Sequence, residues 1–534
     1  MLASPILAMS PVATGKKGPE RSKQLHAKDV LDCFGHHLHG LPETHGRVPS
    51  RMPGSASGQS VSSEWGKPMR HFAWPVVALF QMSAVAAQEP FILDPIFVEA
   101  ASRDVRELLD TPATVSVLET DDLEGRMATT FEELIGDTPG VSIEGGPRGI
   151  AQEPNIRGFQ DEQIVLRFDG GRFNFNQAHR GRFFVDPEIL KRVEVVRGGG
   201  STLYGSGALG GVIAVETKDA DDLLEPGRSG GARVNFGYAS NGEMASGGLT
   251  VFGRQGAVDG LAFFGWRGMG ADLDDGSGET IRNSQLDMMN GLVKFGFEPN
   301  EAHRLEMSLS RYGDDGTTPP NANAVSTPDS DVERDAEVTT ARLSWDYAPA
   351  GSNAVDLSVL LYANELEIIE ETTAGTRIDE TRYDTYGMEV VNRSHLDLGR
   401  PVRLVYGIEA VRDSQEGLRD GAAREQFPDA EATTFAAFGE ATIALSDRFE
   451  LIPGLRYDVY KREPDAAGLA DVDEGFLSPR LGVSYRPNEN WQIYGNVARA
   501  FRAPSLTELY NDGVHFAMEG FPLGPGTTFS GINR

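Results

Sequence analysis

From about residue 230 onward, apolar and polar side chains alternate along extended segments of the chain. In the stretch ARLSWDYAP, apolar residues occupy every second position from Ala341 to Tyr347, with polar residues between them. The same alternation runs through RLEMSLS (304–310) and PVRLVYGIEA (401–410). A period of two places successive side chains on opposite faces of a sheet. The pattern therefore predicts long strands with one apolar and one polar face.

About 13 segments of this kind follow one another, most of them about 9–13 residues long. Long acidic connections such as YGDDGTTPPNANAVSTPDSDVERD separate some of them, and short turns such as YAPAGSN separate others. Long and short connections in alternation are typical of an antiparallel outer-membrane β-barrel. A soluble β-sandwich is the alternative, but sandwich strands are usually about 5–6 residues long. The barrel is therefore favoured.

The N-terminal region has a different character. From Met69 the chain reads MRHFAWPVVALFQMSAVAAQEP, with a positive charge, a short apolar run and small residues before Gln88. This order is typical of a secretory signal peptide, with a buried core helix as the alternative. We expect residues 1–87 to be an upstream extension plus a signal peptide at about 69–87. The single cysteine, Cys33, lies there, so the exported part has no disulfide framework.

The formal net charge of −30 argues against a nucleic-acid partner, which requires a basic face. The spacing of carboxylates, serines and histidines suggests no catalytic cluster. The single possible cysteine nucleophile, Cys33, is lost with residues 1–87. We therefore expect no enzymatic activity.

Residues 100–222 mix helix-like and strand-like segments. TTFEELIGDTPGV (129–141) predicts a helix that ends at Pro-Gly, and QIVLRFDGGRF (163–173) predicts a hairpin. The glycines of YGSGALGG (204–211) match the spacing G-x-G-x-x-G of a dinucleotide-binding turn. That turn must open a helix, whereas here the strand-like VIAVET follows. We expect these glycines to allow close backbone packing at bends.

Three motifs in this region resemble those of TonB-dependent outer-membrane receptors. VEVVRGGGSTLYGSGALGGVIAVET (193–217) resembles the plug signature of that family, PNIRGF (154–159) resembles its other plug motif, and DPIFVEA (94–100) resembles a TonB box. The resemblance covers residues 90–534. It implies a 22-stranded barrel whose lumen holds an N-terminal α+β plug, and transport driven by the proton-motive force through TonB and its inner-membrane complex. The expected divisions are a TonB box and linker at 88–105, a plug at 106–222 and a partial barrel at 223–534.

The candidate TonB box is short, apolar at its centre and close to the new N-terminus, so it can add as an edge strand to a partner sheet. A plain linker is the alternative. Its residues are Asp94, Pro95, Ile96, Phe97, Val98, Glu99 and Ala100. The resemblance further implies that Arg157 and Arg197 help to fix the plug inside the barrel.

Four histidines follow the leader. We interpret His303 and His395 as ordinary strand-end residues. His179 and His515 stand among polar and aromatic residues, and neutral imidazole is a common axial ligand of haem iron. HRGRFFVDP (179–187) and FRAPSLTELYNDGVHF (501–516) are similar to the plug and loop stretches that carry the haem-ligating histidines of haem and haemoglobin receptors. The loop motif begins with Phe501, Arg502, Ala503 and Pro504.

The resemblance thus implies import of haem, free or from haemoproteins, across the outer membrane of a Gram-negative bacterium. Haem is the transported ligand, bound axially by His179 and His515, and no permanently bound cofactor is expected. The leading alternative is a ferric-siderophore receptor of the same architecture. A passive pore or adhesin, and iron capture from transferrin-type host proteins, are further alternatives.

The chain departs from the family at its C-terminal end, GPGTTFSGINR, where an Asn-Pro-Asn-Leu element and roughly eight or nine strands of the 22 are missing. A barrel with two open edges exposes unpaired backbone groups to lipid, at several kcal/mol each. We expect that these 534 residues alone do not insert as a closed receptor.

Overall fold

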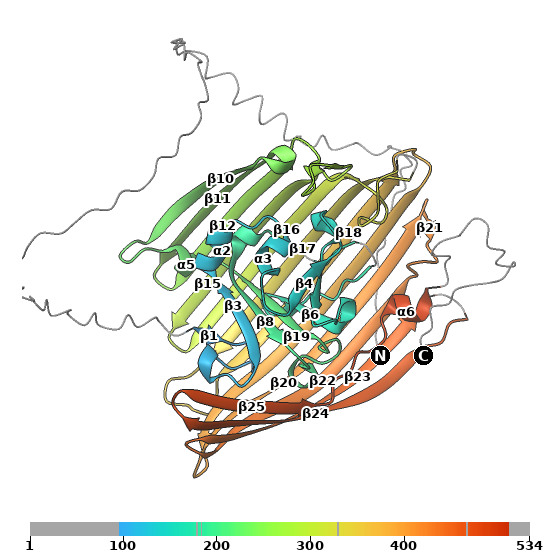
Figure 1. Ribbon diagram of the computed structural model, residues 1–534. Helices are drawn as coiled ribbons and strands as arrows, with labels where there is room; N and C mark the ends of the chain where they lie inside the picture. The colour runs from blue at the N-terminus through green and yellow to red at the C-terminus, as the bar shows by residue number, and fades with distance from the viewer. Residues whose placement is uncertain (1–95, 178–179, 183, 328–329, 466–467, 512–534) are drawn as a thin grey trace, which may run out of the picture. The chain divides into compact units, whose positions relative to one another are not determined.

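The structure is a computed structural model, and it describes residues 96–177, 180–182, 184–327, 330–465 and 468–511. Within the compact unit Pro95–Arg534, the chain builds a small mixed domain and then a large curved sheet (Figure 1). The predicted signal peptide and the upstream extension lie outside the described residues.

Thirteen strands form one continuous antiparallel path in the large sheet. They are β10 (Gly230–Ala239), β11 (Met244–Gln255), β12 (Val258–Met269), β15 (Asp287–Asn300), β16 (His303–Thr318), β17 (Val332–Tyr347), β18 (Leu357–Thr372), β19 (Ile378–Asp397), β20 (Pro401–Arg419), β22 (Ala430–Ser446), β23 (Phe449–Pro464), β24 (Val472–Asn488) and β25 (Trp491–Ala498). The short β21 (Ala422–Ala423) pairs with β20, and β13 (Leu273–Asp274) with β14 (Thr280–Ile281). The path confirms the prediction of about 13 strands. Within the described residues, β10 and β25 each pair with one neighbour.

Most of these strands are longer than the sequence pattern indicated. β19 has 20 residues and β20 has 19, against the expected length of about 9–13. The additional residues lie where both faces are polar, as in RDSQEGLR at the end of β20. Alternation is lost there, so a period-two pattern marks only the part of each strand with one apolar face.

The two faces of the sheet differ as predicted. On β16, Leu305, Met307 and Leu309 are 39–55% exposed, while Ser308 between them is 6% exposed. Apolar side chains thus point away from the enclosed space and polar ones point into it. This arrangement is the reverse of a soluble protein and matches the lipid-facing surface of a membrane barrel. None of the helices in the described part of the chain is long and apolar enough to span a membrane.

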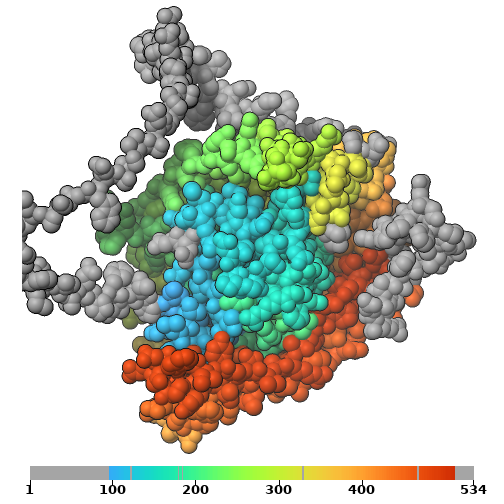
Figure 2. All heavy atoms as spheres, in the orientation of Figure 1, coloured from blue at the N-terminus to red at the C-terminus, as the bar shows by residue number. Residues whose placement is uncertain are grey.

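The plug is built on a five-stranded sheet in the order β3-β8-β9-β6-β7, and it fills the space enclosed by the large sheet (Figure 2). Its strands are β3 (Thr114–Glu119), β6 (Ile164–Phe168), β7 (Gly171–Arg172), β8 (Leu190–Arg197) and β9 (Gly211–Thr217), with the smaller pairs β1 (Phe97–Val98) with β2 (Arg106–Glu107) and β4 (Val141–Glu144) with β5 (Glu153–Ile156). Its α-helices are α2 (Thr120–Arg126), α3 (Phe131–Ile135), α4 (Ser201–Tyr204) and α5 (Ala220–Leu223), and α6 (Leu506–Tyr510) follows the large sheet. The 3₁₀ helices are η2 (Leu108–Asp110), η3 (Gly149–Ala151), η4 (Asp161–Gln163), η5 (Pro187–Ile189) and η6 (Asn241–Glu243).

The predicted helix and hairpin of the plug are confirmed, although the helix ends at Ile135 and not at Pro139–Gly140. TTFEELIGDTPGV contains α3, whose first turn is capped by the side chain of Thr130, and QIVLRFDGGRF forms the β6–β7 hairpin. The plug core gathers fully buried side chains such as Leu134, Leu190 and Val193. The first strand of the large sheet begins at Gly230, after α5.

The glycines of the G-x-G-x-x-G stretch have a structural role. Gly207 adopts φ +90°, and a Cβ at this position would lie 2.6 Å from the carbonyl oxygen of Glu162. A Cβ at Gly210 would lie 2.4 Å from the Cβ of Phe159. The strand β9 follows at once, so no helix N-terminus is available for a pyrophosphate. The prediction of close backbone packing is confirmed.

Candidate functional site

The two histidines predicted to bind haem, His179 and His515, lie outside the residues that the structure describes. The chain beside each of them is described, up to Gln177 and again at Arg180 in the plug, and up to Asn511 after β25. These neighbouring residues show where the two predicted stretches run in the molecule.

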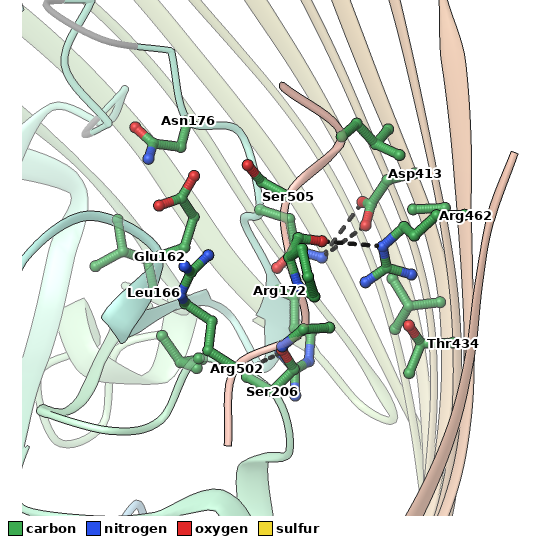
Figure 3. A pocket seen from close by; sticks show the side chains of 18 of the residues that line it. Glu162, Leu166, Arg172, Asn176, Ser206, Asp413, Thr434, Arg462, Arg502 and Ser505 are labelled. Carbon is green, nitrogen blue, oxygen red and sulfur yellow. Dashed lines mark hydrogen bonds between the residues drawn. The ribbon is translucent and has the colours of Figure 1, made fainter. Parts of the chain in front are cut away.

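Both stretches line one cavity of about 110 Å³ between the plug and the large sheet (Figure 3). The plug contributes Asn174, Asn176 and Arg182, and the segment after β25 contributes the consecutive residues 502–507. Strands β20, β22 and β23 add further lining residues, among them Asp413, Thr434 and Arg462. The fold therefore brings together two motifs that are far apart in the sequence.

The family motif that begins at Phe501 connects the large sheet to the plug. The amide of Gly207 donates to the carbonyl of Phe501 at 3.1 Å, and the amide of Ala503 donates to the hydroxyl of Ser206 at 2.8 Å. The Phe501 ring stacks on Phe476 of β24 at 4.3 Å between centroids. These contacts fix the start of the motif against plug and sheet at once.

The helix α6 continues this segment along the cavity. Its first turn is closed by a capping box, in which the amide of Glu508 donates to the Ser505 hydroxyl at 3.2 Å. Arg502 forms an ion pair with Glu508 at 2.6 Å. The Tyr510 hydroxyl donates to the carbonyl of Arg462 at 2.9 Å. The chain is thus held in place to within a few residues of His515.

On the plug side, the loop before His179 is fixed to the sheet. Asn174 donates to the carboxylate of Asp413 at 3.1 Å. Beyond the histidine, Arg180 forms an ion pair with Glu370 at 2.5 Å and donates to the carbonyl of Pro320 at 2.8 Å. The described residues on both sides of the gap at 178–179 are therefore attached to the large sheet.

Arg182 is buried beneath this loop. Its guanidinium donates to the backbone carbonyls of Phe175, Asp161 and Ile164. Burial lowers the pKa of Arg182, against the opposing effect of nearby carboxylates. The side chain fixes the loop to η4 and β6, and its charge remains within the cavity wall.

Aromatic side chains surround the base of the same loop. The ring centroids of Phe173 and Phe184 are 5.8 Å apart, and Phe175 lies 5.7 Å from Tyr383. Phe175 is 1% exposed. The described aromatic residues of this cluster thus form a packed support for the loop rather than an open surface for a flat ligand.

A second cavity, of about 1570 Å³, is also lined by residues of this plug loop. Its wall includes α3, the plug loops around Ile150, and parts of β10, β15 and β16. Arg182 belongs to the walls of both cavities. The smaller cavity lies below the range of about 300–1,000 Å³ that is typical of small-molecule sites, and the larger one exceeds it.

The structure also contains a buried ionic contact between plug and sheet that the sequence analysis missed. Two glutamates on the inner face of β19 and β20 each lie between arginines, and their side chains are at most 11% exposed. The pairs are Arg103–Glu389 (2.8 Å), Arg167–Glu389 (3.2 Å), Arg172–Glu409 (2.7 Å) and Arg456–Glu409 (2.6 Å). An acidic residue on the inward face of an alternating strand is the sequence signal that could have revealed them.

The predicted anchors Arg157 and Arg197 make their observed contacts within the plug. Arg197 donates to the carbonyl of Pro139 at 2.8 Å and to the hydroxyl of Ser116 at 2.9 Å. Arg157 is exposed, and its backbone amide donates to Gly140. Within the described residues, neither arginine forms an ion pair with the sheet, and their anchoring role stays a prediction.

The described part of the candidate TonB box, Ile96–Ala100, packs against the rest of the plug, although Ile96 and Phe97 are each 40% exposed. Val98 is fully buried, and β1 pairs with β2. The amides of Glu99 and Ala100 donate to the carboxylate of Glu194 at 2.8–3.1 Å. The sequence led us to expect a short extended segment that can pair with a partner sheet, and here it pairs with β2 while its backbone contacts the buried Glu194.

The large sheet also contacts the turn formed by residues 99–103. Arg393 of β19 forms an ion pair with Glu99 at 2.6 Å and donates to the carbonyl of Arg103 at 2.6 Å. His395, two residues further on, lies 3.4 Å from the carboxylate of Asp104. His395 therefore contacts the segment that follows the box instead of being only a strand-end residue.

Two family models match the chain. The model described as TonB dependent receptor-like, beta-barrel, matches residues 265–533, half of the chain, and the TonB-dependent Receptor Plug Domain matches residues 107–212. The plug match lies within the small domain, and the barrel match begins in β12.

Characterised relatives are similar over most of the chain. A hemin receptor of Yersinia pestis is 32% identical over 444 residues, which is 81% of this chain and 63% of the relative. The heme/hemopexin utilization protein C of Haemophilus influenzae is 29% identical, over 82% of this chain and 66% of that protein. This chain thus spans slightly less than two thirds of the length of these relatives.

Among solved structures, the hemophore receptor HasR of Serratia marcescens, in complex with its hemophore and heme, superposes with a TM-score of 0.67 at 24% identity. The match covers 76% of this chain and 66% of that one. At this identity the likeness supports the fold alone.

Proposed function

The chain belongs to the TonB-dependent receptors of the bacterial outer membrane, and from that premise we propose that the complete receptor imports haem. Haem is the substrate, and TonB, energised by the proton-motive force, supplies the work. The proposal is one of transport and not of catalysis.

The observation that carries the proposal is the meeting of two distant motifs at one cavity. The plug loop that leads into His179 and the segment that leads into His515 both contribute to its wall. We infer that the two imidazoles bind the haem iron from opposite sides, one from the plug and one from the loop. Neutral imidazole suits this role because its ring nitrogen is a good axial ligand.

The relatives support the choice of substrate. The hemin receptor and the heme/hemopexin utilization protein are named for haem compounds and align with most of this chain. Ferric-siderophore receptors also share the fold, as the alcaligin receptor of Bordetella pertussis does at 15% identity and a TM-score of 0.63. Identity at that level supports the fold alone, so the siderophore alternative has no comparable support.

The docked TonB box suggests how energy reaches the site. TonB pairs with residues 94–100, and we infer that this pairing requires the turn at Glu99–Arg103 to leave Glu194 and Arg393. Force on Arg103 then acts on the buried pair with Glu389. Movement of the plug would separate His179 from His515 and release haem inward.

Growth on haem as the only iron source tests the proposal. A strain that lacks its own haem receptor should grow when it carries the longest reading frame that contains this chain. Growth should cease when TonB is deleted or when residues 94–100 are removed. Growth on a ferric siderophore but not on haem would favour the alternative, and growth without TonB would contradict both.

A further inference from the structure

Arg462 is a buried cation in the wall of the smaller cavity. It lies near the end of β23, its residue is 8% exposed, and it faces the plug loop across the cavity (Figure 3). The inference drawn from it deepens the proposed function and rests on it.

The guanidinium of Arg462 has only neutral hydrogen-bond acceptors among the described residues. Its Nε donates to the carbonyl of Pro504 at 3.4 Å, and Nη1 donates to the carbonyl of Lys461 at 3.0 Å. The Tyr460 ring lies 5.3 Å from its central carbon. No carboxylate of the described chain lies within ion-pair distance, which is unusual for a buried charge.

The other three arginines that line the cavity each have partners that account for their positions. Arg172 pairs with Glu409 and Arg502 pairs with Glu508. Arg182 uses its guanidinium to hold three backbone carbonyls of the plug. Only Arg462 among these four has neither a carboxylate partner nor a full set of carbonyl acceptors in the described structure.

Asp413 is an acidic group on the same wall of the cavity, because Ala432 of β22 pairs with both Asp413 on β20 and Arg462 on β23. Its carboxylate accepts from the Thr385 hydroxyl at 2.7 Å and from Asn174 at 3.1 Å. Two neutral donors therefore satisfy Asp413 without a contact to Arg462. The arginine keeps its capacity to bind an anion, while Asp413 weakens the binding of any anion that enters.

We propose that Arg462 binds a carboxylate on the incoming ligand, which for haem is one of its two propionates. Arginine binds carboxylates through paired, charge-assisted hydrogen bonds. A cavity of about 110 Å³ admits a short carboxylate arm and excludes a porphyrin ring. The ring would then lie outside this cavity, and Arg462 would set the orientation of the ring between the two histidines.

The test compares haem with its dimethyl ester, which has the same ring and iron but no propionate charge. Both ligands are titrated into detergent-solubilised receptor and followed by Soret absorbance. We expect Arg462→Gln to weaken haem binding by about 10- to 100-fold, the effect of losing a hydrogen-bonded charge pair. The same variant should bind the dimethyl ester as the wild type does.

Lys461→Gln is the matched control, because Lys461 is the adjacent cation, its side chain is 42% exposed and it does not line the cavity. It should leave both affinities unchanged. Asp413→Asn should raise the affinity for haem relative to that for the ester, because it removes a negative charge beside the propionate and keeps an acceptor for Asn174. This opposite effect keeps the inference testable if Arg462→Gln does not fold.

Equal losses for haem and ester in Arg462→Gln would overturn the inference, because they would mean that Arg462 only positions Pro504. No loss for either ligand would also overturn it. A wild-type receptor that binds neither ligand would instead overturn the proposed function itself. The three results differ, so failure of the subsite and failure of haem transport can be told apart.

Discussion

A single side chain, Tyr204, connects three parts of the molecule. Its hydroxyl donates to the carbonyl of Ala100 at 2.7 Å, at the end of the candidate TonB box. Its own carbonyl accepts from Arg172, which lines the cavity, and its ring lies 4.5 Å from the guanidinium carbon of Arg103. Burial raises the pKa of Tyr204 to about 12, so the hydroxyl remains a donor at physiological pH.

Tyr204→Phe should loosen the docked box, because it removes one buried hydrogen bond and leaves the Ala100 carbonyl unpaired. The expected loss of stability of the docked box is about 1 kcal/mol, which corresponds to roughly a fivefold rise in the fraction of molecules with the box undocked. The readout is the rate at which a thiol reagent labels a cysteine placed at Ala101, which is 7% exposed. Cys33→Ser serves as the background because Cys33 is the only native cysteine.

Tyr238→Phe is the control for this measurement, since Tyr238 is 73% exposed on β10. In this variant the cysteine placed at Ala101 should be labelled at the wild-type rate. Equal rates for Tyr204→Phe and the wild type would show that this hydrogen bond does not hold the box.

At the scale of elements, the short helix α4 lies between the cavity and the box. All four of its residues, Ser201–Tyr204, are buried. Its first residue is within hydrogen-bond distance of the Phe501 backbone, and its last contacts Ala100. A displacement of the segment at Phe501 would therefore reach the TonB box through a single helical turn.

Local patterns predicted individual elements well and their partners poorly. Alternation located the strands, and the helix-like stretch 129–141 located α3, because these features depend on neighbours in the sequence. The docking of Ile96–Ala100 depends on Glu194 and Arg393, which are about 100 and 300 residues away. No local pattern reports such a contact, so the sequence predicted only that this segment can pair with a partner sheet.

The buried ionic contact between plug and sheet gives an element-scale prediction. Glu409→Gln should destabilise the attachment of the plug by about 3–5 kcal/mol, because it leaves Arg172 and Arg456 without their shared carboxylate. The urea midpoint for protease cleavage of the plug should fall by about 1 M or more.

Glu431→Gln provides the comparison, since Glu431 pairs with Arg412 on the outer face, where both side chains are at least 39% exposed. It should change stability by no more than about 1 kcal/mol. Similar small shifts for both variants would contradict an anchoring role for Glu409.

At the scale of the whole molecule, the sequence allowed the architecture to be predicted further than the site. A lipid-facing surface requires apolar residues such as Leu305 and Met307 to point outward at every second position, and this alternation can be read directly from the sequence. The cavity was predictable only as two motifs, HRGRFFVDP and the segment from Phe501. Its wall also needs Asp413 and Arg462, whose contribution arises when the sheet curves around the plug.

The central claim is that His179 and His515 together bind haem. The most direct measurement is a haem titration, followed by Soret absorbance, of outer membranes that carry the longest reading frame containing this chain. Wild type is compared with His179→Ala and His515→Ala. His303→Ala is the control, because His303 is the first residue of β16 and stacks on Tyr347. We expect a six-coordinate, low-spin spectrum that is lost or weakened in the first two variants and kept in the third. Haem binding that is indifferent to both His179 and His515 would contradict the account and favour a siderophore receptor.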